Sequence, residues 1–122
     1  FGSYTGNGSA DGPFVYTGFK PRFILYKRSD AGVENWRVRD TARDTYNPSQ
    51  TILRPNISDA EVGSVEPIDM LANGFKVRTT DGSANTSGGT YIYAVFAESP
   101  FKYATAGASA AASTPFFIAW EF

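Results

Sequence analysis

The residues best suited to chemistry in this chain are five charges within eight positions. Arg37, Arg39, Asp40, Arg43 and Asp44 lie in the stretch RVRDTARD. Guanidinium groups bind carboxylates through paired hydrogen bonds, so the stretch predicts a grip on an acidic sugar or on a neighbouring subunit. Alternatively, the aspartates pair with the arginines across a loop, where each exposed ion pair contributes about 0 to 1 kcal/mol.

A second group of oxygen-bearing side chains alternates along TTDGSANTSGG. Asp81, Ser83 and Asn85 have a spacing that can surround calcium, although the downstream bidentate glutamate of a recognised calcium loop is missing. A turn stabilised by Asx hydrogen bonds at Asp81 explains the same residues equally well. We therefore assign neither a metal nor another cofactor from the sequence.

Carboxylates are the remaining candidates for catalysis. Asp59 with Glu61, or Glu66 with Asp69, could form the acid and base of a glycoside hydrolase, but that mechanism depends on a separation that sequence does not give. Helix capping and solvent exposure are the ordinary interpretation of such residues. We expect a protein that is not an enzyme and has no catalytic residue.

Aromatic residues make up 16% of the chain and could form a platform on which sugars stack. Most aromatics of a small β domain fill its core instead. We expect four in the core, namely Phe23, Trp36, Phe75 and Phe96. We expect three tyrosines as surface contacts, namely Tyr4, Tyr46 and Tyr103.

Composition excludes several classes of protein. The chain has no histidine and no cysteine, which removes a Ser-His-Asp triad, a cysteine nucleophile, a disulfide framework and a thiolate metal site. Eleven basic and twelve acidic residues leave it almost neutral, so a nonspecific nucleic-acid binder is not expected. No apolar run is long enough to span a bilayer. A chain that begins at Phe1 suggests a processed protein or an excised fragment.

The elements that must position these residues are strands. Short runs of β-branched and aromatic residues alternate with Gly, Pro, Asn and Asp, a pattern typical of all-β domains. Seven or eight such runs in 122 residues predict one antiparallel β-sandwich, resembling a jelly roll. Residues 22–28 and 90–97 carry apolar residues on both faces, which predicts central strands covered on both sides.

Local patterns predict finer features. Alternation in NWRVR would turn Trp36 and Val38 inward and both arginines outward. Asn73-Gly74 between apolar runs predicts a hairpin. A further strand is expected over 51–54. The capping-box spacing of residues 58–61 predicts at most one short helical turn.

The C-terminal part has a different composition. Residues 105–114 are small and polar and predict a flexible linker, after which residues 115–122 form an apolar strand. Its large residues are the candidate assembly contacts Phe116, Phe117, Ile118, Trp120 and Phe122. The strand docks on its own sheet or adds to a neighbour's edge, and self-docking is the favoured alternative.

Six short motifs follow one another along residues 1–104: YTGNG, GFKP, DTARD, NISDAE, NGF and YAVFAESPFK. In this order they resemble a module of tailed-bacteriophage structural proteins, the tail-fibre domain found beside concanavalin-like LamG jelly-roll domains. Residues 107–122 have no counterpart in that pattern.

The resemblance implies a non-catalytic, β-rich building block of a virion, made in the bacterial cytoplasm and placed in a tail fibre or other surface appendage. Its expected partners are copies of itself, other virion proteins and host-surface glycans, without nucleic acid or membrane insertion. A motif shared by many fibres also favours the structural interpretation of the arginines and aspartates. A capsid decoration protein and a lectin-like carbohydrate-binding domain are the alternatives.

Overall fold

The computed structural model describes residues 1–97, and the structural statements below concern that part of the chain. Seven strands and one helical turn follow in the order β1 (Gly2–Thr5), β2 (Phe14–Tyr16), β3 (Pro21–Arg28), β4 (Arg37–Asp40), β5 (Ile68–Leu71), β6 (Gly74–Val77), α1 (Gly82–Asn85) and β7 (Thr90–Ala97). The expected linker, C-terminal strand and module boundary at residue 104 lie outside these residues.

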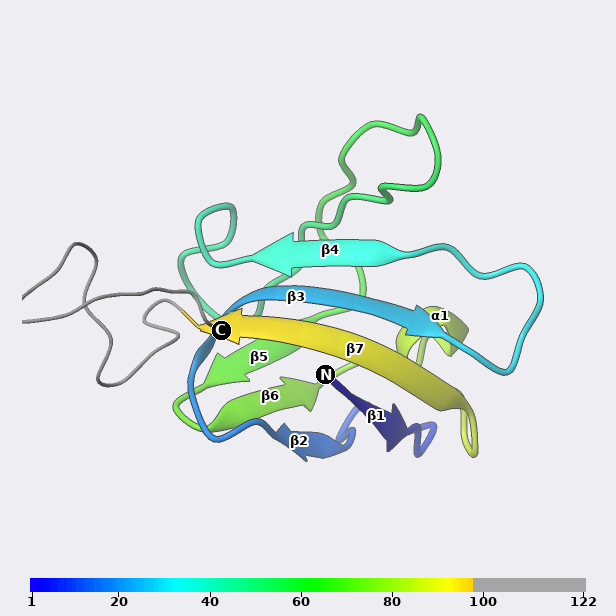
Figure 1. Ribbon diagram of the computed structural model, residues 1–122, viewed down its shortest axis with the longest axis horizontal. Helices are drawn as coiled ribbons and strands as arrows, with labels where there is room; N and C mark the ends of the chain where they lie inside the picture. Colours follow the sequence, from blue (N-terminus) through cyan, green and yellow to red (C-terminus); the bar gives the residue numbers. More distant parts are fainter. Residues whose placement is uncertain (98–122) are drawn as a thin grey trace, which may run out of the picture.

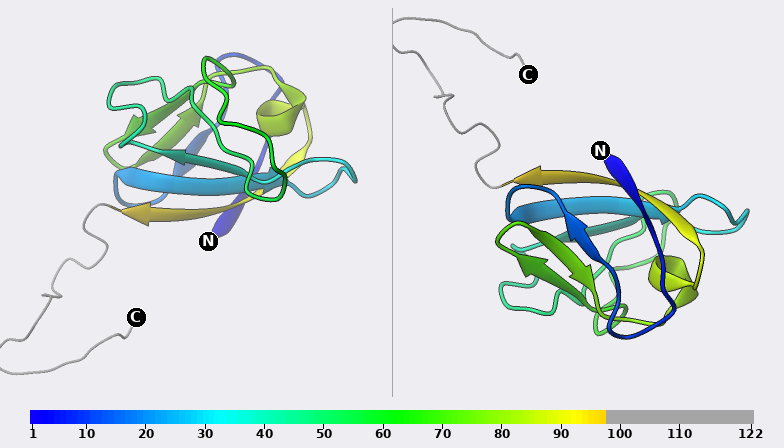
Figure 2. Two further views of the ribbon diagram at one scale, coloured as in Figure 1. Left: turned by 90° about the horizontal axis from the view of Figure 1, so that it is seen from above. Right: turned by 90° about the horizontal axis from the view of Figure 1, so that it is seen from below.

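The strands form two antiparallel sheets. One has the order β1-β7-β3-β4 and the other the order β2-β6-β5 (Figure 1). Figure 2 shows them as two facing layers. The all-β sandwich expected from the sequence is confirmed.

Buried residues of both layers form the core. The four-stranded sheet contributes Tyr4, Ile24, Tyr26 and Tyr91, and the three-stranded sheet contributes Val15, Ile68, Met70, Phe75 and Val77. Antiparallel partners point to the same face, so alternate residues of β3 and β7 line the core together. The alternation read from these two strands is confirmed.

The opposite, outer face of the four-stranded sheet is not covered by an element within residues 1–97 (Figures 1 and 2). Ile92 is 38% exposed and Phe96 is 49% exposed on this face. Phe96 was expected in the core and is not there, and Phe23 beside it is only partly buried. Residues 1–97 therefore cover only one side of β3 and β7, and the expected cover on the other side stays a prediction.

A hairpin joins β5 and β6 through Ala72-Asn73, as the Asn-Gly signal predicts. Gly74 begins β6, where an added Cβ would lie 2.1 Å from the carbonyl oxygen of Val15. Glycine is required there because the backbone of β2, the neighbouring strand in the same sheet, lies too close for a side chain.

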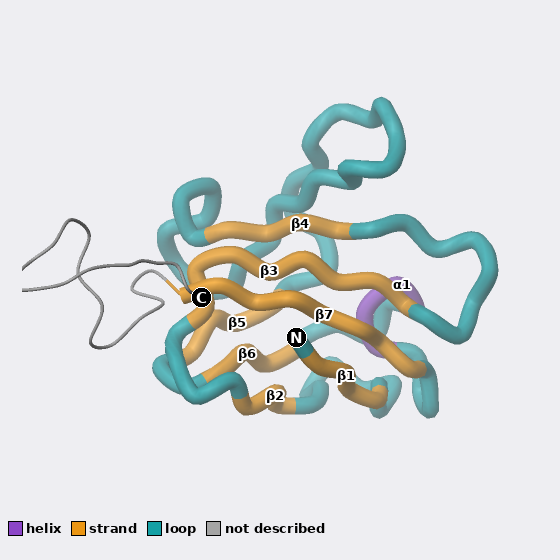
Figure 3. Tube along the Cα trace, in the orientation of Figure 1, coloured by secondary structure: helices purple, strands orange, loops and turns teal. Residues whose placement is uncertain are grey.

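The long connection between β4 and β5, residues 41–67, passes beside both sheets and extends beyond β4 (Figure 3). Isolated bridges fasten it to β4 at Val38–Leu53 and to β5 at Ser49–Ile68. Residues 51–54 make such bridges and not the expected strand, and residues 58–61 form no helical turn. The helical turn is α1, capped by Asp81.

Candidate functional site

The charged stretch begins on β4, and its orientation is opposite to the prediction. Arg37 and Arg39 are 7% and 0% exposed, whereas Trp36 and Val38 are only partly buried. Arg37 pairs with Tyr26 and Arg39 with Ile24, two core residues of β3, so both guanidiniums enter the layer between β4 and the long connection. The prediction failed because polarity alone does not reveal which side of an edge strand holds hydrogen-bond acceptors.

Arg39 is held by oxygen acceptors from three segments. It donates to the carbonyl oxygens of Ser49, at 2.8 Å, and of Val65 and Glu66, and to the Tyr26 hydroxyl at 3.2 Å. A buried guanidinium is tolerated when its donors are satisfied in this way. Its role is to fasten the connection to β4.

Arg37 forms the neighbouring buried ion pair. Its Nε lies 3.0 Å from the Oε2 atom of Glu66, and the Ser83 hydroxyl of α1 contacts the same oxygen. Burial raises the pKa of Glu66, although Arg37 and Arg39 oppose the shift. Glu66 is thus buried and paired, and the expectation of an ordinary exposed carboxylate is wrong.

Asp40, Arg43 and Asp44 lie where β4 leaves the sheet. Asp40 accepts a hydrogen bond from the Arg43 backbone N–H at 2.8 Å, and the Arg43 guanidinium reaches Glu61 at 2.8 Å. Asp44 accepts from Gln50 N, Thr51 N and the hydroxyls of Ser49 and Thr51. Burial raises the pKa of Asp44, but these donors outweigh it and leave the pKa below its usual value. Asp40 pairs with Arg43, as the structural interpretation of the stretch expects. Asp44 differs, because it binds residues 49–51 of the connection and not an arginine.

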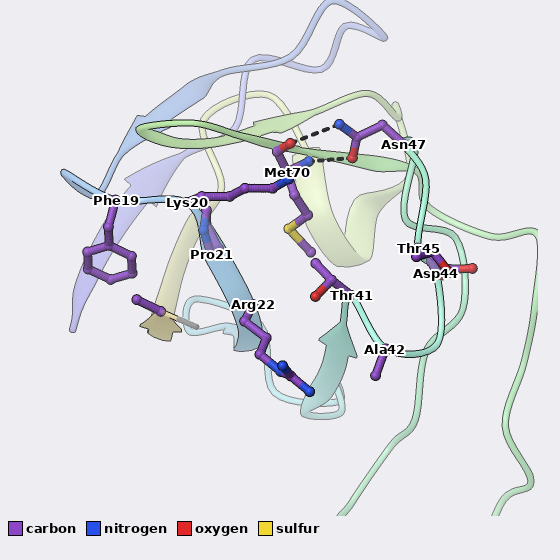
Figure 4. Close-up of a pocket in the computed structure, with 11 residues that line it drawn as sticks. Phe19, Lys20, Pro21, Arg22, Thr41, Ala42, Asp44, Thr45, Asn47 and Met70 are labelled. Carbon is purple, nitrogen blue, oxygen red and sulfur yellow. Dashed lines mark hydrogen bonds between the residues drawn. The ribbon is translucent and has the colours of Figure 1, made fainter. Parts of the chain in front are cut away.

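A cavity of about 540 Å³ opens at the end of β7, between the turn before β3 and the start of the connection (Figure 4). It is lined by Phe19, Lys20, Pro21, Arg22, Thr41, Ala42, Asp44, Thr45, Asn47, Met70 and Ala97. The amide of Asn47 bonds the backbone of Met70 in both directions, at 2.8 Å each, and so fixes one wall. Lys20 and Arg22 bring positive charge to this cavity and Asp44 brings negative charge, a mixture that suits a hydroxyl-rich ligand. Sequence reasoning missed these two residues, although the GFKP turn marks the place.

The tyrosines separate into three cases. Tyr46 is 86% exposed beside the cavity, between the lining residues Thr45 and Asn47, as expected of a surface contact. Tyr4 is 8% exposed and donates its hydroxyl to the Ala84 carbonyl, so its prediction as a surface contact is wrong. Tyr103 and the candidate assembly residues Phe116, Phe117, Ile118, Trp120 and Phe122 lie outside residues 1–97.

The side-chain oxygens whose spacing could surround calcium take part in internal hydrogen bonds. Asp81 caps α1 by accepting from Ser83 N at 2.8 Å, and the Ser83 hydroxyl keeps the pKa of Asp81 low. Asn85 is fully buried, accepts from Asn7 N and donates to the carbonyls of Ser9 and Thr79. Within residues 1–97 no group of three or more acidic, histidine or cysteine residues could hold a metal ion. The loop therefore ties α1 to the N-terminal segment.

The two carboxylate pairs considered for hydrolysis have arginine partners. Asp59 lies 3.4 Å from Arg54, and Asp69 lies 2.7 Å from Arg78. Glu61 and Glu66 contact Arg43 and Arg37, as described above. These ion pairs connect neighbouring segments of the fold.

Comparison with known proteins gives one result. No curated protein and no solved structure matches the chain. No helix within the part of the chain that is described has the length and apolarity to cross a membrane. One family model, described as "Domain of unknown function (DUF7483)", matches residues 1–100, and the chain therefore belongs to the DUF7483 family.

Proposed function

We propose that this chain is a non-catalytic structural module of a bacteriophage virion that builds a tail fibre or another surface appendage. The proposal starts from the ordered motifs that resemble the phage module. Nearly all of this stretch lies within residues 1–100, which match the family model.

One observation carries the proposal: residues of three of the motifs make contacts that hold the fold together. Asp44 of DTARD gathers four hydrogen bonds from residues 49–51. Asn7 of YTGNG bonds the buried Asn85, and Gly74 of NGF admits the backbone of β2. A module reused in many fibres has to keep the contacts that hold its fold together, whereas its exposed surface can vary. This distribution supports a scaffold.

One side of the sandwich, formed by β1 and β2, also suits assembly. The connection covers β4 and β5, whereas β1 and β2 have no further strand beside them within residues 1–97 (Figure 1). Phe14 and Tyr16 of β2 are 44% and 69% exposed there. Unpaired edges and exposed aromatics favour a partner on this side, either another copy or another virion protein.

Immunogold electron microscopy of purified virions tests the proposal. Antibodies raised against residues 1–97 should decorate the tail or an appendage. Gold on the capsid shell would favour the decoration protein. A virion role would be refuted if intact virions carried no label and if their mass spectra contained no peptide of this chain.

A second candidate function is the binding of host-surface glycans. Tyr46 is exposed and lies in the chain between two residues that line the open cavity, and Lys20 and Arg22 line that cavity. An aromatic ring next to hydrogen-bonding cations is a common way to hold a sugar.

A glycan array with the full chain tests this second function. Tyr46→Ala should reduce glycan binding at least tenfold. Tyr16→Ala is the matched control, because it removes an exposed tyrosine from β2 and should leave glycan binding unchanged. Equal loss in both variants, or no saturable binding at all, would reject a glycan site at the cavity.

A further inference from the structure

The outer face of the four-stranded sheet is mainly apolar and has no cover within residues 1–97. Strand register places six apolar side chains on it in three neighbouring strands, namely Phe23, Leu25, Val38, Ile92, Ala94 and Phe96, and it places Lys27 and Asp40 at the ends of this group. The Phe23 and Phe96 rings contact each other at a centroid distance of 5.7 Å. Contiguous apolar surfaces of this kind mark interaction sites.

The chain beyond the described part has a matching composition. In residues 115–122 four large apolar residues occupy alternate positions, namely Phe116, Ile118, Trp120 and Phe122. An extended segment would present all four on one side and Phe117, Ala119 and Glu121 on the other. One side of such a segment is as apolar as the sheet face.

The position of Ala97 brings the sheet face and residues 115–122 together. β7 ends at Ala97, directly after the exposed Phe96, and seventeen residues separate Ala97 from Pro115. A flexible chain of that length has a root-mean-square span of about 20–25 Å, and a strand of eight residues is about 26 Å long. The segment therefore reaches every part of the face.

The covalent connection to β7 also favours residues 115–122 over a second copy of the chain as the segment that covers the face. A segment attached so closely has an effective concentration in the millimolar range, far above that of a second copy in dilute solution. We propose that residues 115–122 pack in cis across the outer face of the β1-β7-β3-β4 sheet. This inference does not rest on the virion role proposed above.

Fluorescence of Trp120 tests the proposal in the full-length chain. Trp36→Phe leaves Trp120 as the single tryptophan. Its emission should be blue-shifted, and acrylamide should quench it several-fold less than it quenches a free peptide of residues 115–122. Its emission and quenching should not change on dilution to a concentration at which sedimentation gives a monomer.

Variants of the face make the test specific. In the Trp36→Phe chain, Ile92→Ser and Phe96→Ser should each raise quenching toward that of the free peptide. Val33→Ser is the matched control, because Val33 is an exposed aliphatic residue outside the face, at 91% exposure, and its replacement should leave quenching unchanged. Far-ultraviolet circular dichroism checks that each variant is folded.

Three results would overturn the proposal. Trp120 could be quenched as easily as in the free peptide. It could be protected but insensitive to both face variants, which would place the segment elsewhere, such as at the edges of β1 or β2. It could also be protected only in a dimer that loses protection on dilution, which would make the contact one between copies.

Discussion

The two ends of the interior contain different kinds of side chain. Beneath β1 and β7 it is aromatic: Tyr4 stacks on Tyr91 with ring centroids 4.9 Å apart, and Phe75 meets Tyr93 edge-on at 5.5 Å. Beside β4 it is ionic, with Arg39 among carbonyl oxygens and Arg37 against Glu66.

The difference teaches how each end keeps its place. Aromatic rings gain free energy from burial itself and need a polar partner only at the hydroxyl. Buried guanidiniums lose hydration and are tolerated only while acceptors surround them, and the connection supplies most of these acceptors. The aromatic end therefore joins the sheets directly, whereas the ionic end depends on residues 49–66 staying in position.

Replacing Arg39 should have the largest effect on this comparison. Arg39→Met keeps much of the volume but removes a donor from the carbonyls of Ser49, Val65 and Glu66, of which the Ser49 carbonyl keeps its bond from Ile68 N. We expect the free energy of unfolding to fall by about 2 to 4 kcal/mol. Urea denaturation followed by circular dichroism measures the change. Arg78→Met is the control, because the Arg78 side chain is 48% exposed and should lose less than about 1 kcal/mol. Similar losses in both variants would deny the ionic end its special role.

Tyr91→Phe tests the polar tips of the aromatic end. The Tyr91 hydroxyl donates to the Gly82 carbonyl at 2.6 Å and accepts from Thr86 N at 2.8 Å. Losing both bonds while keeping the ring should cost about 2 kcal/mol in the same denaturation experiment. Tyr46→Phe, at an exposed position, should cost nothing measurable. A Tyr91→Phe variant as stable as the parent would mean that burial of the ring alone holds this end.

Asp44→Asn gives a smaller effect that depends on pH. The pKa of Asp44 lies below its ordinary value of 3.8 in the folded protein, so the stabilisation from its carboxylate is complete above pH 3.8 and is lost as pH falls through the lowered pKa. At pH 7 the variant should be about 1 to 2 kcal/mol less stable. Denaturation at several pH values should show a constant difference from pH 5 to 8 and a shrinking one in acid. A difference that grew in acid would contradict the assignment.

Asp59→Ala should have the smallest effect. The pair between Asp59 and Arg54 is ionic like the buried one, but the Asp59 side chain is 60% exposed. Water screens such a pair, so the change in the free energy of unfolding should stay below about 0.5 kcal/mol. A thermal melt at low and high salt measures it. A loss above about 1 kcal/mol would show that the connection depends on its exposed ion pairs as well.

Periodicity predicted much of the fold because alternation along a strand is a local property. The opposite faces of β3 and β7 and the hairpin at Asn73-Gly74 follow from neighbouring residues alone. The prediction of a helical turn from the capping-box spacing of residues 58–61 was wrong. It used a four-residue signal, whereas the backbone of the next residue, Val62, pairs with Ile52 in an antiparallel bridge.

The candidate site was predicted less well. The sequence marked Arg37, Arg39, Asp40, Arg43 and Asp44 as a charged unit and favoured a structural role for it. It could not tell that Asp44 binds residues 49–51, that Lys20 and Arg22 line a cavity, or that Tyr4 is buried while Phe96 is exposed. Each of these depends on which segment passes beside the residue in space.

The sequence by itself determined an all-β chain without histidine or cysteine, the alternation of its longest strands and the position of its tightest hairpin. Only the tertiary structure decided that Arg37 and Arg39 point inward on β4. The physical reason is that a side chain's orientation at a sheet edge follows the partners available on each side. Those partners, Glu66 and the carbonyls of Ser49 and Val65, come from a connection up to 29 residues away.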